Sequence, residues 1–511
     1  MSWNLYDRLF GSAKADGAPC IETDGRPVVS YAELAAMSAA YASFLIVRGI
    51  GPGHRVVVKV EKSVETVALY LGILRAGAVY VPLNTAYTAA ETAYFINDAR
   101  PALVVCAPGE LEEIRPIAAA SGADVETLND DGGGSLAAAV AHCPACFDTV
   151  PRGRDDLAAI LYTSGTTGRS KGAMLTHGNL ATNALTLAGE WRFTQSDTLI
   201  HALPIYHIHG LFVACHVSFA ARARILFMKK FEAERIIDAM AQATALMGVP
   251  TFFIRLLQSS RLKQAATNMR VFISGSAPLL AETHREWKDR TGHAILERYG
   301  MTETGMITSN PYEGERVPGS VGYPLPGVEV RITDVETGAT LPDTNFGMIE
   351  VRGPNVFAGY WRMPERTAAE FRPDGFFVTG DLGKLNGRGY LQIVGRDKDL
   401  IITGGLNVYP KEIEAEIDSI PGVSESAVIG VPHSDFGEGV TAAVVRKPGA
   451  AVDEGAILDA LARRVAKFKQ PKRIVFVDEL PRNSMGKVQK NLLRERFADL
   501  YAPDQPDHVS S

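Results

Sequence analysis

The 511-residue sequence predicts an α/β fold: a large amino-terminal domain with mainly parallel sheets, followed by a small α+β domain. Segments of strand character alternate with helical ones in the first part of the chain. The chain then becomes rich in short strands and turns, and a charged stretch precedes a new α/β segment. At this length we expect two to four compact units.

The alternating part favours an α/β fold with largely parallel sheets because strand and helix characters follow one another in order. Strand character falls on 56–60, 102–106, 157–161, 225–227 and 270–274, and helical character on 31–47, 64–75, 233–242 and 280–291.

The sequence pattern changes between about residues 317 and 394. Short strands, such as 328–332 and 348–351, are separated there by Gly, Pro and Asp, which favours a small barrel or mixed sheet. Residues 395–398 begin a charged stretch that we interpret as a hinge. Beyond it we expect helices at 410–419 and 454–465, and strands at 425–429, 441–446 and 474–477.

The composition is that of a soluble globular enzyme, with 46% hydrophobic and 22% charged residues and a net charge of -6. There is no basic excess to suggest a nucleic-acid surface. The amino terminus lacks the pattern of a secretory signal, and no span is apolar enough to predict a membrane helix. Five cysteines do not form a disulfide framework, so we expect a cytoplasmic protein.

Residues 162–172, Tyr-Thr-Ser-Gly-Thr-Thr-Gly-Arg-Ser-Lys-Gly, have the features of a phosphate-binding loop. Glycines allow the backbone to approach a ligand, hydroxyl and N–H groups donate, and Lys171 adds charge. The loop follows an apolar strand, where open α/β sheets bind ligands. An ordinary solvated loop is the alternative. A Walker loop is excluded because Gly168 is followed by Arg-Ser-Lys instead of Lys-Ser/Thr.

Three later segments supply groups that a magnesium nucleotide needs. Residues 274–278 follow a strand and open a helix, so their backbone can meet a flat base. Residues 297–304 carry an aromatic to stack on a purine, a hydroxyl for phosphate and the carboxylate of Glu303 for Mg²⁺. Asp381 follows a strand and a glycine, where it can accept two ribose hydroxyls; a plain turn residue is the alternative.

The run 162–172 closely resembles the phosphate loop of the superfamily of acyl-CoA synthetases, luciferases and peptide-synthetase adenylation domains. The motifs up to Lys487 follow that family's order. The resemblance implies an AMP-binding domain over residues 1–394 and an associated domain over 399–511. It also implies two steps. A carboxylate attacks Mg·ATP to give an acyl-adenylate and pyrophosphate, and the thiol of coenzyme A then displaces AMP, after a rotation at Lys398.

The resemblance also assigns roles to single residues. Thr302, Glu303 and Lys487 would be catalytic, with Glu303 at the metal. Lys487 would contact oxygens that gain charge in the transition state, so its loss should cost about 10²–10³ in rate. Gly404 and Gly405 would flank the pantetheine of coenzyme A. ATP or AMP would be bound by Thr163, Ser164, Gly165, Thr166, Thr167, Gly168, Lys171, Ser276, Ala277, Glu297, Tyr299, Gly300, Met301, Thr302, Asp381, Arg396 and Lys487.

Arg298 is the residue that indicates which kind of acid is the substrate. Most members of the superfamily carry a small residue before the stacking tyrosine, because that position lines the acyl pocket. A buried cation needs a partner, and an acid with a second carboxylate would provide one. Arg255 could clamp that carboxylate jointly, because guanidinium pairs bidentately. Alternatively, Arg298 bridges to Glu297 or another acid on the outside.

Other residues complete the predicted pocket. His207 occupies the position of the family's aromatic or His gate, whereas His209 is best read as a buried, hydrogen-bonded histidine. Met306 would bound the same pocket. Arg270 and Arg285 are interpreted as structural.

Within the family the chain is most similar to malonyl-CoA synthetases, which predicts malonate as the acid. Methylmalonate is a second candidate, which the bulk of Ile208 disfavours. A short- or medium-chain monocarboxylate ligase is the first alternative. A non-catalytic acyl or nucleotide-binding scaffold is the second, although the complete set of catalytic groups argues against it. Malonate, ATP and CoA are thus the expected partners, with no nucleic acid and no membrane. A lysine acetyltransferase acting on Lys487 would abolish its charge.

Overall fold

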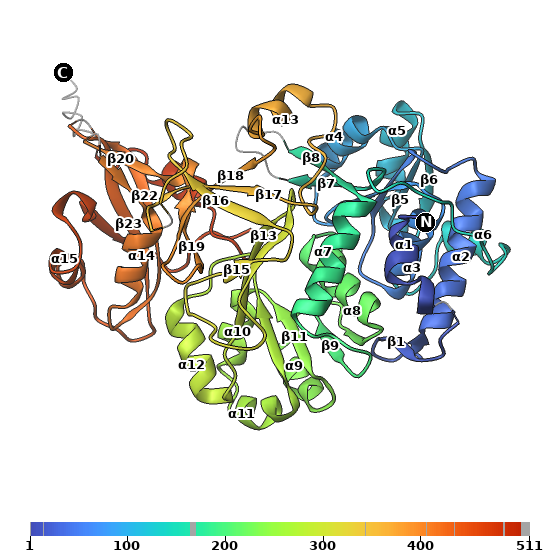
Figure 1. The fold of residues 1–511 in the computed structure, drawn as a ribbon, viewed down its shortest axis with the longest axis horizontal. Coiled ribbons are helices and arrows are strands. Elements are labelled where there is room, and N and C mark those ends of the chain that lie inside the picture. The colour runs from blue at the N-terminus through green and yellow to red at the C-terminus, as the bar shows by residue number, and fades with distance from the viewer. Residues whose placement is uncertain are drawn as a thin grey trace, which may run out of the picture.

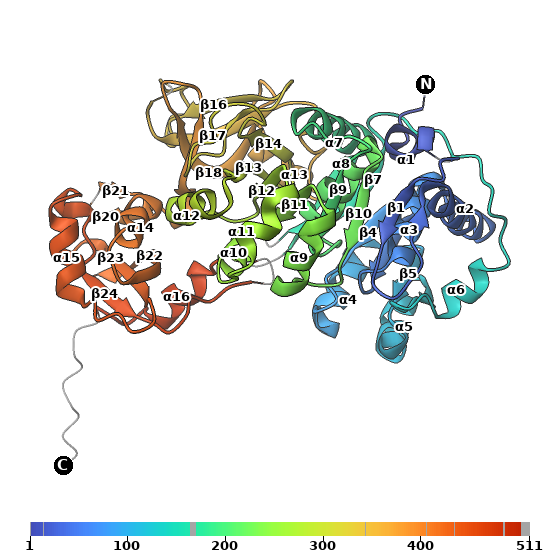
Figure 2. The same ribbon diagram turned by 90° about the horizontal axis from the view of Figure 1, so that it is seen from below.

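The computed structural model describes residues 2–13, 15–163, 170–342, 344–404, 406–433, 435–483 and 486–501. Within these ranges the chain forms four sheets flanked by helices. Figures 1 and 2 show an elongated molecule, with the amino-terminal sheet at one end and the carboxyl-terminal sheet at the other. The predicted α/β class is therefore confirmed.

The amino-terminal sheet has the strand order β6-β5-β3-β4-β7-β8. All its neighbours run parallel except β7 and β8, which form an antiparallel hairpin around the predicted phosphate loop. The strands are β3 (Arg55–Lys59), β4 (Val79–Pro82), β5 (Leu103–Cys106), β6 (Asp124–Thr127), β7 (Leu157–Thr163) and β8 (Lys171–Thr176), and the helices are α2 (Tyr31–Val47), α3 (Val64–Arg75), α4 (Ala89–Ala99), α5 (Leu111–Ala120) and α6 (Ser135–Val140).

The second sheet has the order β15-β14-β13-β12-β11-β9-β10-β1-β2. From β10 to β13 its strands are parallel, so their carboxyl ends share one edge, and the chain then turns back into antiparallel β14. The strands are β1 (Pro19–Glu22), β2 (Val29–Ser30), β9 (Thr198–His201), β10 (Arg224–Phe227), β11 (Ala245–Gly248), β12 (Val271–Ser274), β13 (Leu296–Met301), β14 (Gly305–Ser309) and β15 (Tyr323–Pro324).

Helices cover this second sheet, and one segment departs from α geometry. The π-helix His209–Cys215 is fully buried and begins at the histidine that we interpret as buried and hydrogen-bonded. The α-helices are α1 (Leu5–Leu9), α7 (His177–Glu190), α8 (His216–Ala221), α9 (Ala233–Ala239), α10 (Pro250–Leu256), α11 (Leu262–Ala265) and α12 (Ala281–Thr291).

The predicted β-rich region forms a four-stranded antiparallel sheet, in the order β16-β17-β18-β19. Its elements are β16 (Glu329–Thr333), β17 (Gly347–Arg352), β18 (Phe377–Leu385) and β19 (Leu391–Arg396), with α13 (Pro364–Glu370) between β17 and β18.

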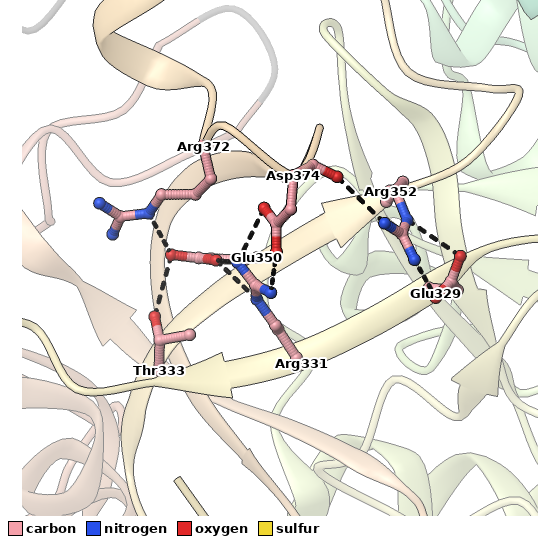
Figure 3. A network of polar contacts seen from close by, with 7 residues as sticks. All are labelled: Glu329, Arg331, Thr333, Glu350, Arg352, Arg372 and Asp374. Carbon is pink, nitrogen blue, oxygen red and sulfur yellow. Dashed lines mark hydrogen bonds and ion pairs between the residues drawn. The ribbon is translucent and has the colours of Figure 1, made fainter. Parts of the chain in front are cut away.

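A fully buried carboxylate holds this small sheet together. Glu350 on β17 accepts from Arg331 Nε at 2.8 Å, Arg372 Nε at 2.7 Å and Thr333 Oγ1 at 3.0 Å. Figure 3 shows the three donors converging on it from neighbouring segments, with Asp374 beside Arg331. The buried charge is therefore satisfied entirely by the chain.

The carboxyl-terminal sheet has its own apolar core, built from both of its faces and its helices. None of the helices in the described ranges combines the length and the apolar run that crossing a membrane requires. The elements are β20 (Ile401–Thr403), β21 (Leu406–Val408), β22 (Val423–His433), β23 (Gly437–Arg446), β24 (Arg473–Phe476), α14 (Pro410–Asp418), α15 (Glu454–Ala462) and α16 (Lys490–Arg496).

Candidate active site

Three residues predicted to bind nucleotide meet where the second and third sheets approach each other. The hydroxyl of Tyr299 donates to Asp381 Oδ2 at 2.6 Å, and Arg396 Nε lies 2.8 Å from Asp381 Oδ1. Burial and the Asp381 carboxylate raise the pKa of Tyr299, so its hydroxyl keeps its proton, and the same carboxylate raises the pKa of Arg396. Each carboxylate oxygen retains a lone pair that a ribose hydroxyl could use.

A second cluster lies at the ends of β7 and β8. Glu303 is 5% exposed and accepts from Tyr360 Oη at 3.1 Å and Thr163 Oγ1 at 3.4 Å. Burial raises its pKa. Lys171 Nζ lies 3.1 Å from Glu370 Oε1 and 4.1 Å from the centre of the Tyr360 ring. The structure therefore brings together the predicted metal-binding carboxylate and the predicted phosphate-binding cation.

Tyr360 and Glu370 were missed by the sequence reasoning. The Tyr360 hydroxyl also donates to Glu370 Oε2 at 2.6 Å, so it joins two carboxylates, and Arg366 completes the cluster at 2.6 Å from Glu370. Both residues come from the segment around α13, far from the phosphate loop in sequence, and neither belongs to a recognisable motif. The only signal in the sequence was the spacing of Arg366 and Glu370, which lie four residues apart and so share one face of a helix.

Part of the predicted phosphate loop cannot be placed. Ser164, Gly165, Thr166, Thr167 and Gly168 lie outside the described residues, and so does Gly405. The described flanks of the loop face each other, since Thr163 on β7 pairs with Lys171 on β8.

The wall predicted for the base is formed by the ends of β12 and β13. Ser276 has a positive φ of 71° and its hydroxyl lies 3.2 Å from His209 Nδ1. Glu297 is buried, and its Oε1 lies 3.1 Å from His284 Nδ1 on α12. A Cβ at Gly300 would stand 2.0 Å from the carbonyl oxygen of Gly305, so the tight β13–β14 turn requires glycine there. Ala277, Met301 and Thr302 are half-buried in the same two segments.

Arg298 is buried without a carboxylate partner. Its side chain is on β13, the residue is 4% exposed, and its Nε and Nη2 atoms have no hydrogen-bond partner in the described part of the chain. Burial lowers its pKa to about 9, so the guanidinium is still charged at neutral pH. It packs against Gly275, where a Cβ would lie 2.3 Å from Arg298 Cζ. The alternative of a bridge to Glu297 is not what the structure shows, since Glu297 pairs with His284.

Neutral histidines face the same guanidinium. Burial, followed by the charge of Arg298, lowers the pKa of His207 to about 4, and the same two causes lower the pKa of His209. Met306 is fully buried on β14, and its side chain packs against Gly300. Arg298 therefore lies among uncharged groups that can border a pocket.

Arg255 lies in the last turn of α10, is exposed, and has its guanidinium 5.8 Å from the centre of the Phe231 ring. The joint clamp with buried Arg298 stays a prediction. At the other end of α10, Thr251 lies next to Gly486. The short helix therefore faces the segment that carries Lys487.

Lys487 reaches the nucleotide cluster from the carboxyl-terminal unit. Its segment is a tight hairpin in which Lys487 N donates to Asn483 Oδ1 at 3.0 Å and Asn483 N donates to the Lys487 carbonyl at 3.0 Å. Although solvent reaches the side chain, the surrounding protein and the charge of Arg396 lower the pKa of Lys487 to about 8, against the opposing effect of Asp381. Its ammonium group is thus close enough to interact electrostatically with both Arg396 and Asp381.

The predicted hinge and the described part of the CoA segment lie just before this unit. Lys398 is in the 3₁₀ turn Asp397–Asp399, which follows β19, and is exposed. Its neighbour Asp399 pairs with Arg494 at 2.7 Å. Gly404 has a φ of 57°, a conformation that glycine adopts without strain.

These features define an adenylate-forming type of site, and comparison with known proteins places it in a family. Residues 12–361 match the AMP-binding enzyme family, and residues 412–487 match the AMP-binding enzyme C-terminal domain. The chain therefore belongs to the AMP-binding enzyme family.

Within this family, several proteins that are similar over most of the chain are malonate–CoA ligases or MatB. ATP-bound MatB from Rhodopseudomonas palustris is 62% identical with a TM-score of 0.96, over 98% of this chain and 100% of that one; apo MatB gives a TM-score of 0.87. A malonate–CoA ligase from Arabidopsis thaliana is 34% identical over 87% of this chain and 80% of its own length. Mitochondrial malonate–CoA ligase ACSF3 from Mus musculus is 36% identical over 84% and 79%.

Proposed function

We propose that this protein ligates malonate to coenzyme A through a malonyl-adenylate, at the expense of ATP. The choice of malonate as the acid rests on one observation: the guanidinium of Arg298 is buried and has no carboxylate partner in the described chain. An uncompensated buried charge is costly, and a ligand carboxylate would remove that cost. The similarity to malonate–CoA ligases supports the same acid.

In the first step one malonate carboxylate oxygen forms a bond to the α-phosphorus of ATP, and the bond to the β-phosphate oxygen breaks. Lys487 would stabilise the charge on the carboxylate and α-phosphate oxygens. Tyr299 would stack on the adenine while Asp381 holds the ribose and Arg396 holds Asp381. The resemblance to ATP-bound MatB is consistent with this arrangement.

Glu303 and Lys171 would handle the departing pyrophosphate. A single buried carboxylate beside the phosphate loop fits Mg²⁺, which takes one or two protein carboxylates with water and phosphate oxygens. When bound, the ion would neutralise phosphate charge. Because Glu370 pairs with Lys171, phosphate binding would have to replace that contact. Thr163 and Thr302, with the residues from Ser164 to Gly168, would complete the phosphate site.

In the second step the sulfur of coenzyme A forms a bond to the malonyl carbonyl carbon, AMP leaves, and the thiol proton is released. We place a hinge at 395–398, between a domain of residues 1–394 and one of 399–511. Rotation at Lys398 would withdraw Lys487 and bring Gly404 and Gly405 to the pantetheine. We also propose a cytoplasmic location and acetylation of Lys487 by a lysine acetyltransferase; mass spectra with Lys487 always unmodified would contradict the latter.

The distal carboxylate of malonate would pair with Arg298, with His207 and Met306 bordering the pocket. Arg255 would act at most at the pocket's outer rim, because it is exposed. Ile208 is 4% exposed beside His207 and limits the room for a methyl branch, so methylmalonate would be a poorer substrate.

Pyrophosphate release with Mg·ATP tests the proposal, comparing malonate, methylmalonate and butyrate, with mass spectrometry of the thioester when CoA is added. We expect malonate to be preferred. A preference for butyrate would support a monocarboxylate ligase, and no turnover with any acid would support a scaffold.

Gly275→Ala sharpens this test. Its Cβ would displace the Arg298 guanidinium without removing the charge, so KM for malonate should rise while KM for ATP changes little.

A further inference from the structure

A second cavity, of about 530 Å³, lies at the opposite edge of the large sheet from the nucleotide cluster. Its lining includes Arg270, directly before β12, and Ala294, two residues before β13. The nucleotide groups Ser276 and Met301 follow or end the same two strands. The cavity is therefore separate from the candidate active site, although both are built on β12 and β13.

The acidic groups of this cavity are already neutralised. Glu313 Oε1 accepts from Arg192 at 2.7 Å and Glu315 Oε2 accepts from Arg388 at 2.7 Å. Neither arginine lines the cavity. Each carboxylate therefore has a cation outside the cavity as its hydrogen-bond partner, although burial lowers the pKa of Arg316 and the charge of Glu313 opposes that shift.

One lining arginine is likewise balanced. Arg270 donates to Asp197 through Nε at 2.6 Å and Nη2 at 2.8 Å. This fits the structural role predicted for Arg270.

Three lining cations lack such a partner. Arg316 donates to the carbonyls of Ala294, Pro311 and Tyr312 at 2.7, 3.1 and 2.9 Å, which fixes the guanidinium without an ion pair to a carboxylate. Arg285 and Lys288 are exposed one turn apart on α12. No carboxylate in the described ranges lies within 4 Å of any of the three.

A buried histidine connects the cavity to the nucleotide wall. His284 lines the cavity and is 1% exposed, and its Nε2 has no hydrogen-bond partner among the described residues. Its Nδ1 lies 3.1 Å from Glu297 Oε1, in the segment 297–304 that carries the predicted purine-stacking Tyr299. Because solvent does not reach Nε2, a ligand in the cavity would have to move the His284 ring to engage it, and that movement would act on the group that positions Glu297.

We propose that this cavity binds a phosphate-bearing small molecule, and that His284 and Glu297 couple its occupancy to nucleotide binding. Three cations from two segments suit phosphate, which guanidinium groups bind with charge-assisted hydrogen bonds. The volume is in the range of small-molecule sites. Free phosphate or diphosphate and a nucleotide phosphate share this chemistry, and the coupling is an equilibrium effect that must act both ways.

Calorimetric titration of the full chain tests binding, with the active site saturated by a non-hydrolysable ATP analogue and Mg²⁺. The probes are phosphate, diphosphate and adenosine 3′,5′-bisphosphate; tighter binding of the last would identify a nucleotide source, and of diphosphate a free anion. We expect Arg285→Glu to weaken the best probe at least about tenfold. The matched control is Lys263→Glu, an exposed cation on α11 outside the cavity, which should change binding less than about twofold.

Equal losses in both variants, or no binding of any probe at about 1 mM, would overturn the proposed site. For the coupling, the best probe should shift the Kd of the ATP analogue in the unmodified protein, and His284→Asn should abolish the shift while the probe still binds. A shift that persists in His284→Asn would overturn the coupling. The readouts are binding constants, so the outcome does not depend on which acid the enzyme activates.

Discussion

Two buried charges in neighbouring sheets are treated in opposite ways. Glu350 on β17 receives donors from Arg331, Arg372 and Thr333, whereas Arg298 on β13 leaves two guanidinium nitrogens without a partner in the described chain. Both residues are nearly inaccessible, so burial alone does not distinguish them. The difference shows that the small sheet is electrostatically complete as folded (Figure 3), whereas Arg298 leaves room for a charged partner, which we propose is the ligand carboxylate.

Removing the unpartnered charge should have the largest effect, and the effect should be on substrate choice. For Arg298→Leu we expect kcat/KM for malonate to fall about 10³-fold, because the distal carboxylate would be buried unpaired. Activity with butyrate should hold or rise. Pyrophosphate release with the two acids measures this, and an equal loss for both would show that Arg298 serves folding or ATP binding.

Removing the partnered charge should affect stability instead. Glu350→Gln should lower the free energy of unfolding by about 3 kcal/mol, because it leaves two arginines with a weakened partner. The malonate-to-butyrate ratio should not change. Urea unfolding provides the measurement, and Glu329→Gln in the exposed pair with Arg352 is the control, expected to leave the free energy of unfolding nearly unchanged. Similar losses of unfolding free energy in the two variants would mean that burial of the Glu350 network does not determine its contribution to stability.

Lys487 extends the comparison to another cation without an ion-pair partner among the described residues. Its pKa is lowered to about 8, so its ammonium form, which we propose is catalytic, dominates below that pH and is lost above it. The adenylation rate should therefore fall about tenfold between about pH 7 and pH 9. Lys490→Ala should retain the profile, since Lys490 pairs with Glu414 at 2.5 Å, and Lys487→Arg should flatten it. A profile unaltered by Lys487→Arg would assign the titration to another group.

The smallest effect concerns a single donor to Glu350. Thr333→Val keeps the shape of a fully buried side chain and removes one hydrogen bond of 3.0 Å. We expect a loss of about 1 kcal/mol in unfolding free energy, because both arginines remain. A loss as large as that of Glu350→Gln would make the hydroxyl, instead of the ion pairs, the main partner.

Elements defined by local pattern could be predicted from the sequence. The helices at 31–47 and 64–75 coincide with α2 and α3, because helical periodicity and capping serines act within a few residues. The helix predicted at 233–242 ends as α9 at Ala239 and continues as a 3₁₀ turn. Ends of this kind depend on packing against later segments.

Features of the site that depend on distant segments could not be predicted. Glu370 meets Lys171 across 199 residues, and no motif marks either Glu370 or Tyr360. The direction of Arg255 is set by the short helix α10 and by the ring of Phe231, which precedes α9. Arg298 was recognisable because it is an arginine at a position where the motif usually carries a small residue, and the sequence alone shows that difference.

Gly275 determines where the charge of Arg298 lies. A methyl group there would stand 2.3 Å from Arg298 Cζ, and because the guanidinium is the far end of a flexible side chain, the guanidinium would move and the backbone would not. The residue at 275 and the position of the arginine charge are therefore linked. The absence of one Cβ thus fixes the position of the charge on which the proposed choice of acid depends.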